Sequence, residues 1–267
     1  MANIEKKIKN IVKIGSAMWK CYLNSASAVY KKLKSLKVSI FDESSELVKR
    51  SISGSLIVFL YFTVITIGGG LYSFAILVAA LIAFYETVIL ITHNSKSVMF
   101  KAHLKNGLVV ILITFSSLLL IRFTPQGERV TLWLFLVVIS LDTAAYAIGK
   151  SFGKKAILPN ISPNKTLEGA IGGSIVALII SMITYTILSG YNNSFFKFSY
   201  FIIASILLII GAQIGDILQS IVKRHFKVKD MGNVIPGHGG VMDRMDSFVV
   251  AAPLTLLLIT IVNGRLF

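Results

Sequence analysis

Acidic residues and cysteine are scarce in this 267-residue chain. It has 12 Asp and Glu against 27 Lys and Arg, a formal net charge of +15, and a single cysteine, Cys21. One cysteine excludes a disulfide framework, and no spacing of His and Cys suits zinc. No Ser-His-Asp order of a hydrolase stands out. No secretory signal is visible, because residues 1–50 are charged where a cleaved segment would be apolar.

Apolar sequence is abundant. Hydrophobic residues make up 55% of the chain, and the mean hydropathy is +0.77, which is rare for a soluble domain of this length. The pattern predicts an all-α membrane helix bundle with about seven spans, within a range of six to nine. The predicted spans are residues 52–67, 71–91, 107–121, 130–149, 169–188, 199–222 and 248–262. The first and third are short for a bilayer.

The positive charge is unevenly distributed between the predicted loops. With the N-terminus inside, the cytoplasmic segments would be residues 1–50, 92–106, 150–168 and 223–247, and they hold 23 of the 27 Lys and Arg. This asymmetry is what the positive-inside rule predicts. The net charge is therefore attributed to topology and lipid contact, and we expect no nucleic-acid binding.

The chain divides into a basic arm, residues 1–50, and a transmembrane catalytic domain, residues 51–267. On a helical wheel, the apolar residues of 4–36 fall in one arc and the lysines fall opposite it or on its flanks, with Ile14 the misfit. This pattern predicts an amphipathic helix in the membrane interface that contacts anionic lipids. The alternative is a helix packed on another protein or on loops of this chain.

Few acids remain in residues 51–267, and several of them fall within the predicted spans. Asp142 and Asp216 lie inside spans, and Glu86 lies toward the end of another. Ionisable groups in a span are costly and normally face a polar cavity or a partner. We expect functional roles for Asp216, Asp142 and Glu86. The alternative is structural pairing with a buried Lys or Arg.

Two polar loops carry the groups needed to bind a metal and a polyphosphate. Asp216, Ser220 and Lys223 have i, i+4, i+7 spacing and share one helical face. Asp243 and Asp246 follow in the next polar segment, and carboxylates converging from separate segments suit Mg²⁺. Capping of the last span is the plainer interpretation of Asp246.

The loop of residues 150–168 adds Lys154, Lys155 and Lys165, and Thr166 or Asn164 can cap the next span. The GAIGGS segment that follows is best explained by close helix packing, because it does not fit the spacing of a P-loop. The PGHGG segment, residues 236–240, is either a tight turn or a set of backbone N–H groups turned toward an anion.

At these residues the chain resembles the phosphatidate cytidylyltransferases (CDP-diacylglycerol synthases). The family signature is matched at Ser220, Lys223, Arg224, Lys229, Asp230, Gly232, Pro236, His238, Gly239, Gly240, Asp243, Arg244 and Asp246. The upstream segments Asp142–Tyr146 and Ser162–Gly169 are also similar to the family. The resemblance runs from about Arg50 to the C-terminus, while residues 86–129 look shorter than usual.

The resemblance implies that CTP and phosphatidic acid react to CDP-diacylglycerol and pyrophosphate with Mg²⁺, and it leaves room for a second cation. It implies a bacterial inner membrane enzyme whose site faces the cytoplasm. The expected catalytic residues are Asp216, Lys223, Asp243 and Asp246, and the three aspartates are the expected metal ligands. The expected substrate-binding residues are Asp142, Lys165, Ser220, Arg224, Lys229, Asp230, His238, Gly239, Gly240 and Arg244.

Two other functions fit parts of the pattern. One is a CTP-dependent enzyme acting on an ether-lipid phosphate or on a polyprenol, which would receive the γ-phosphate of CTP. The other is a transporter, because intramembrane acids also mark ion paths, although no inverted repeat is visible. Small residues in the spans would serve either a homodimer or internal packing.

Overall fold

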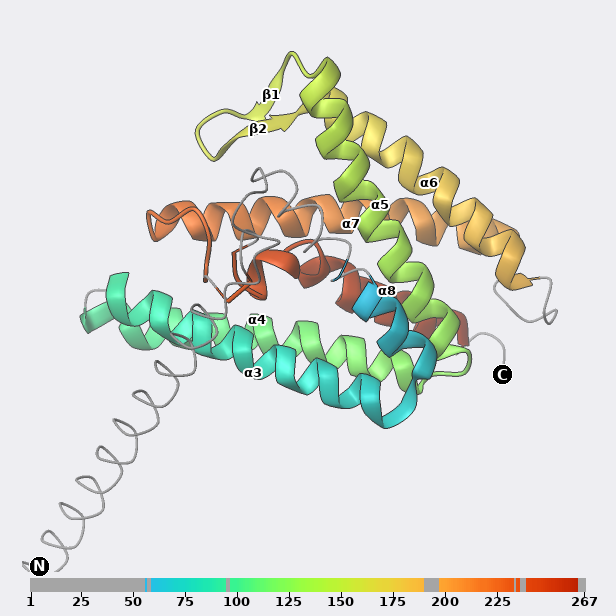
Figure 1. Ribbon diagram of the computed structural model, residues 1–267, viewed down its shortest axis with the longest axis horizontal. Helices are drawn as coiled ribbons and strands as arrows, with labels where there is room; N and C mark the ends of the chain where they lie inside the picture. The colour runs from blue at the N-terminus through green and yellow to red at the C-terminus, as the bar shows by residue number, and fades with distance from the viewer. Residues whose placement is uncertain are drawn as a thin grey trace, which may run out of the picture. The chain divides into compact units, whose positions relative to one another are not determined.

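The computed structural model describes residues 56, 59–94, 97–189, 197–232, 234–235 and 239–263. The predicted interfacial helix in residues 1–50 lies outside these residues. The described elements are α3 (Gly69–Asn94), α4 (Ser97–Phe123), α5 (Gly127–Phe152), β1 (Ala156–Leu158), β2 (Ser162–Thr166), α6 (Leu167–Ser189), α7 (Phe198–His225), the short 3-10 helix η2 (Met242–Arg244) and α8 (Phe248–Asn263). Residues 59–67 are also helical (Figure 1). The all-α class is confirmed.

Five of these helices are long and apolar enough to cross a membrane. They cover Gly69–Thr92, Ala102–Phe123, Gly127–Phe152, Leu167–Ser189 and Phe198–His225. Phe248–Val262 is a shorter apolar helix. The third predicted span is longer than expected, because the helix continues through polar residues such as His103 that flank the apolar run. The total number of spans stays a prediction.

The three predicted cytoplasmic loops that the structure describes lie at one end of the bundle. The ring of His103 in α4 is 5.3 Å from that of His225 at the end of α7. Arg224 donates from Nε to the carbonyl oxygen of Ile161, at 2.9 Å, in the loop after α5. At the opposite end, Arg122 forms a 3.5 Å ion pair with Glu128. The predicted grouping of these loops on one side is therefore confirmed.

The outer surface of α6 carries an apolar stripe. Ile171, Ile175, Ile179, Ile183 and Ile187 follow i, i+4 spacing and are all exposed. A soluble monomer rarely leaves such a contiguous apolar surface uncovered. The stripe is explained by contact with lipid, and it supports the membrane assignment.

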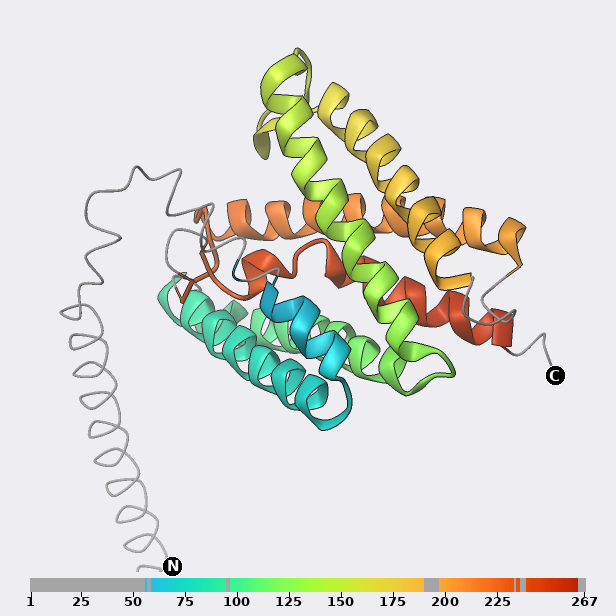
Figure 2. The same cartoon turned by 45° about the vertical axis from the view of Figure 1, so that its right-hand side comes forward.

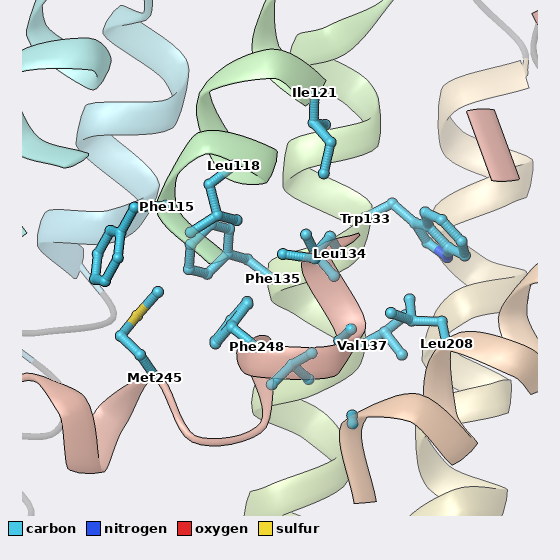
Figure 3. Close-up of a cluster of buried hydrophobic side chains, with 14 of the residues drawn as sticks. Phe115, Leu118, Ile121, Trp133, Leu134, Phe135, Val137, Leu208, Met245 and Phe248 are labelled. Carbon is cyan, nitrogen blue, oxygen red and sulfur yellow. The ribbon is translucent and has the colours of Figure 1, made fainter. Parts of the chain in front are cut away.

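Buried apolar side chains from several helices form one core (Figure 3). Phe115 and Leu118 of α4 meet Leu134 and Phe135 of α5, and Phe248 at the start of α8 packs 4.6 Å from the Phe135 ring. Such interdigitation accounts for most of the stability that tertiary packing adds to helices.

A chain of hydrogen bonds also ties three helices together inside this core. Trp133 Nε1 in α5 donates to Ser181 Oγ in α6 at 2.7 Å, and Ser181 Oγ lies 2.7 Å from Ser205 Oγ in α7. All three side chains are buried, so each polar atom needs such a partner. These hydrogen bonds therefore fix how the three helices are positioned lengthwise against one another.

Helices α5 and α6 lie side by side in both views (Figures 1 and 2). A Cβ on Gly169 would lie 2.6 Å from the carbonyl oxygen of Ala145, and one on Gly173 would lie 2.8 Å from the Ala145 Cβ. Only glycine permits this approach, so the prediction that GAIGGS serves helix packing is confirmed.

The segment between α5 and α6 contains a small antiparallel hairpin. β1 pairs with β2 in the register Ala156↔Thr166 and Leu158↔Ser162. The sequence predicted only a loop here, because the strands are three and five residues long and lack an apolar alternation. The hairpin places Lys165 directly before α6. Thr166 Oγ1 accepts a hydrogen bond from Gly169 N at 3.2 Å, so the predicted cap at Thr166 is confirmed.

Candidate active site

A polar cavity of about 340 Å³ opens where α5, α7 and the hairpin meet the segment before α8. Its lining residues are Leu141, Asp142, Ala145, Tyr146, Ile157, Ser162, Asn164, Lys165, Thr166, Ala170, Gln213, Asp216, Ile217, Asp243, Arg244 and Asp246. Six of these are predicted site residues. They come from parts of the chain about 100 residues apart, and they place four carboxylates and two cationic side chains around one space.

Lys165 joins the hairpin to α7. Its Nζ lies 2.6 Å from Asp216 Oδ2 and donates to Ser220 Oγ at 3.1 Å. Asp216 and Ser220 are one helical turn apart, so the predicted shared face exists and points toward this lysine. Both members of the ion pair are about a quarter to a third exposed, so the pair remains accessible from the cavity.

Lys223, one further turn along α7, connects two more of the four aspartates. Its Nζ lies 3.1 Å from Asp243 Oδ1 and 3.5 Å from Asp246 Oδ2. The Lys223 side chain is 12% exposed, and that of Asp243 is 2% exposed. One ammonium thus offsets two carboxylates in a weakly hydrated setting, where an unpaired charge would be costly.

Asp243 also organises the backbone of the loop around it. Its Oδ2 accepts hydrogen bonds from Met231 N at 2.8 Å and Gly240 N at 2.9 Å. Gly239 has a φ of +81°, and a Cβ there would lie 2.9 Å from Asp243 Oδ2. Glycine is required at this position for the left-handed backbone and for the close approach.

Asp246 and Asp142 are linked through Ser247. Asp246 Oδ1 accepts from Ser247 N at 3.0 Å, one residue before α8 begins, and capping of α8 by Asp246 stays a prediction. Ser247 Oγ lies 3.2 Å from both carboxylate oxygens of Asp142, and it can donate to one of them. Burial raises the pKa of Asp246 to about 6; the charge of Asp216 adds to the rise and that of Lys223 opposes it.

Other residues of the predicted substrate-binding set have different surroundings. Arg224 donates from Nη1 to Val228 O at 2.9 Å, besides its bond to Ile161, and so braces two loops. Lys229 and Asp230 are exposed and are not among the described residues that line the cavity. Gly239 and Gly240 face carboxylates of the protein, Asp243 and Glu86 respectively. His238 lies outside the described residues.

The polar groups fit a magnesium ion that shares its coordination with a substrate. Within the described part of the chain, no three His, Cys, Asp or Glu side chains group closely enough to hold a metal by themselves. Mg²⁺ is commonly bound by one or two carboxylates together with substrate phosphates. Asp216 and Asp246, 29% and 16% exposed, are better placed for this than Asp243, whose two oxygens are already engaged.

Two residues near the site, Ser247 and Gln213, were not predicted, and Glu86 was expected to be functional but was not assigned to the site. Ser247 bridges two aspartates, and Gln213 Nε2 ties α7 to α6 by donating to Ser174 Oγ at 2.8 Å. Glu86 contacts the loop before η2. A signal was available for Gln213 and Glu86, since each is a polar residue within an apolar span, but their partners lie far away in sequence.

An apolar groove adjoins the polar cavity. It has a volume of about 390 Å³ and is lined by Tyr61, Leu71, Phe74, Ala75, Val78, Ala79, Ile82, Ile235, Val241 and Arg244. Arg244 also lines the polar cavity, so its exposed guanidinium belongs to both spaces. This arrangement suits a ligand with an anionic group at one end and apolar chains at the other.

Comparison with known proteins agrees with the resemblance seen in the sequence. A model of the Cytidylyltransferase family matches residues 39–262. A phosphatidate cytidylyltransferase of Bacillus subtilis (strain 168) is 40% identical over 126 residues, which are 47% of this chain and 45% of the relative. Proteins of the same name from Staphylococcus haemolyticus (strain JCSC1435) and Staphylococcus aureus (strain COL) are 43% and 41% identical over 134 and 136 residues.

In both Staphylococcus pairs the alignment covers 50% of each chain, so this chain spans about half the length of the curated relatives it matches. The match to the family model extends further and includes every described element from α3 to η2, and most of α8. This chain belongs to the Cytidylyltransferase family.

Proposed function

We propose that the protein transfers the cytidylyl group of CTP to phosphatidic acid, yielding CDP-diacylglycerol and pyrophosphate at the cytoplasmic face of a bacterial inner membrane. The observation that carries this proposal is Arg244, which lines a polar cavity with four carboxylates on one side and an apolar groove on the other. A soluble nucleotide needs only the first space, whereas an anionic lipid needs both.

The reaction joins two anions, so the main requirement is to hold them together and offset their charge. A phosphate oxygen of phosphatidate attacks the α-phosphorus of CTP, and the bond from that phosphorus to the bridging oxygen of pyrophosphate breaks. The nucleophile is already anionic at neutral pH, so no strong general base is needed. Catalysis then depends on orientation and on fixed positive charge.

The cationic residues of the cavity suit these tasks. Arg244, with its planar guanidinium, would bind the lipid phosphate at the mouth of the groove. Lys165 would bind the triphosphate, because it stands at the hairpin beside the start of α6, where the helix dipole also favours an anion. Lys223 would keep Asp243 and Asp246 in position and offset their charge.

Asp216 and Asp246 would hold a Mg²⁺, with Asp243 as the anchor of the loop that carries Asp246. A bound Mg²⁺ supplies charge stabilisation on phosphate oxygens and a template for their alignment. Asp216 is paired with Lys165 at the cavity, so these two side chains stand together where the ion and the triphosphate would meet. A second cation would find a further oxygen ligand in Asp142, which lines the same cavity.

The test is incubation of the purified protein with CTP labelled at the α-phosphate, phosphatidate and Mg²⁺. The expected result is a lipid that carries the label and the cytidine, together with release of pyrophosphate. Release of CDP with transfer of the γ-phosphate to a polyprenol would contradict the proposal and favour the kinase alternative. Solute flux in vesicles without nucleotide turnover would favour the transporter. Comparing turnover of diacyl phosphatidate with that of an ether-linked lipid phosphate tests the alternative that the enzyme acts on ether lipids.

A further inference from the structure

Glu86 is a buried carboxylate whose only hydrogen bonds within the described part of the chain are to a distant loop. It lies in α3, is 3% exposed, and is about 150 residues from its partners. Its Oε1 accepts from Val241 N at 3.0 Å, and its Oε2 accepts from Met242 N at 3.1 Å. Each oxygen thus takes one backbone N–H at the start of η2. Hydrogen bonds to a charged acceptor are stronger than those between neutral groups.

Two glycines of the loop pack directly against this carboxylate. A Cβ on Gly240 would lie 2.5 Å from both Glu86 oxygens, and a Cβ on Gly232 would also overlap the Glu86 side chain. Any larger residue at either position would displace the carboxylate or the loop. Two of the glycines in the signature therefore have a structural reason that involves Glu86 and not a bound phosphate.

The residues held by Glu86 directly precede those that face the polar cavity. Val241 O accepts from Arg244 N at 3.0 Å, so the turn anchored at Val241 and Met242 determines where Asp243 and Arg244 project. Asp243 takes two further backbone N–H groups, from Met231 and Gly240. The loop is thus fixed from two sides, by Asp243 from within and by Glu86 from α3.

We propose that Glu86 is a positioning residue for the reaction proposed above: it anchors the loop before α8 to α3 and so places Asp243, Arg244 and Asp246 at the cavity. This inference rests on the proposed function for its catalytic part. Its structural part, the anchoring of two backbone amides, can be measured without any substrate.

Glu86→Gln is the sharpest substitution, because it keeps the shape of the side chain and removes one acceptor. An amide offers one oxygen and one NH₂, so an N–H donor of the protein must then face another donor. If Glu86 only filled space, Glu86→Gln would leave amide exchange and turnover nearly unchanged. Glu86→Asp, with its shorter side chain, would then be the more harmful substitution. If Glu86 accepts two N–H groups, Gln should be at least as harmful as Asp.

The matched control is Thr87→Val. Thr87 neighbours Glu86 in α3, is 4% exposed, and donates within its own helix, to Ala83 O at 2.8 Å. Valine keeps its shape. We expect this variant to retain the turnover and the amide exchange of the unsubstituted protein, because Thr87 makes no hydrogen bond to those residues of the loop that the structure describes.

The first measurement is hydrogen–deuterium exchange of the full-length protein in detergent, without nucleotide or metal. In Glu86→Gln, we expect at least one of the amides of Val241 and Met242 to exchange at least about tenfold faster, the change that loss of one hydrogen bond to a charged group produces. The second measurement is turnover with CTP and phosphatidate. We expect it to fall on the order of 10- to 100-fold, since a misplacement of about 1 Å can cost about 10²-fold.

Unchanged amide exchange and turnover in Glu86→Gln would overturn the proposal. A fall in turnover no larger than that of Thr87→Val would overturn it as well. Faster exchange with no loss of turnover would overturn the catalytic part. Should Glu86→Gln fail to fold, Gly232→Ala, which pushes against the Glu86 side chain, decides by the same two measurements. If the unsubstituted protein made no CDP-diacylglycerol, the proposed function would fail, while the exchange result would still report on the anchor.

Discussion

The ammonium of Lys223 between two carboxylates makes a quantitative prediction about stability. Lys223→Met keeps most of the volume of the side chain and removes its charge. The ion pairs are 3.1 and 3.5 Å long, and all three side chains are at least four-fifths buried. Removal of one partner of a buried ion pair costs about 3–5 kcal/mol, because a charge is left uncompensated. An exposed pair would cost about 1 kcal/mol or less.

The cost should depend on pH, and its sign follows from Asp246. The pKa of this carboxyl is raised to about 6 by burial and by Asp216, so the folded state favours its protonated form. Its stabilising contribution is therefore present at low pH and is lost as the pH rises through 6. Without Lys223 the pKa of Asp246 should rise further, because the ammonium that opposes the rise most is gone and only the weaker effect of Lys165 remains among the lysines. Lys223→Met should thus be most harmful at pH 8 and least harmful at pH 5.

Thermal unfolding in detergent with a metal chelator measures this effect. We expect the midpoint of Lys223→Met to lie about 10 °C below that of the unsubstituted protein at pH 8, at roughly 2–4 °C per kcal/mol. The difference should be clearly smaller at pH 5. Lys105→Met is the matched control, since Lys105 is an exposed lysine of α4, and we expect little change at either pH. Equal destabilisation of Lys223→Met at both pH values would refute the reasoning.

Two further predictions concern activity. Asp216→Asn should lower kcat by on the order of 10²-fold or more in a pyrophosphate-release assay, because it removes the carboxylate that faces Lys165 and the expected metal. Near-normal turnover would show that Asp216 is not part of the site. A chain that starts near Leu47 should lose activity on vesicles rich in anionic lipid more than on neutral mixed micelles, because the arm is expected to bind the anionic surface; equal activity of both forms on both would refute a role for the arm.

The helices were predictable from local sequence, because a span needs only about 20 apolar residues in a row. Each apolar run from residue 71 onward lies within a helix, and the shared face of Asp216 and Ser220 follows from the helical repeat. The grouping of loops at one end was also predictable, since lysines and arginines cluster on one side of successive spans. In both cases the controlling interactions are between near neighbours or with the membrane.

The hairpin and the anchors of the loop were not predictable in this way. β1 and β2 are too short to show an alternating pattern, and they form because the turn joins them between two fixed helix ends. Gly240 suggested a cradle for phosphate, yet a carboxylate of the protein occupies the space against it. A glycine indicates that something approaches closely, and the sequence does not say what.

Alone, the order of residues determined the membrane class, the helices, the charge asymmetry and the set of polar residues from which a site could be built. The folded chain decided the pairing: Lys165 with Asp216, Lys223 with Asp243 and Asp246, and Glu86 with the backbone of residues 241 and 242. The physical reason is the sequence separation over which each interaction acts. Apolar length and helical repeat act within a few turns, whereas each of these contacts joins residues 20 to 156 positions apart and exists only once the helices have packed.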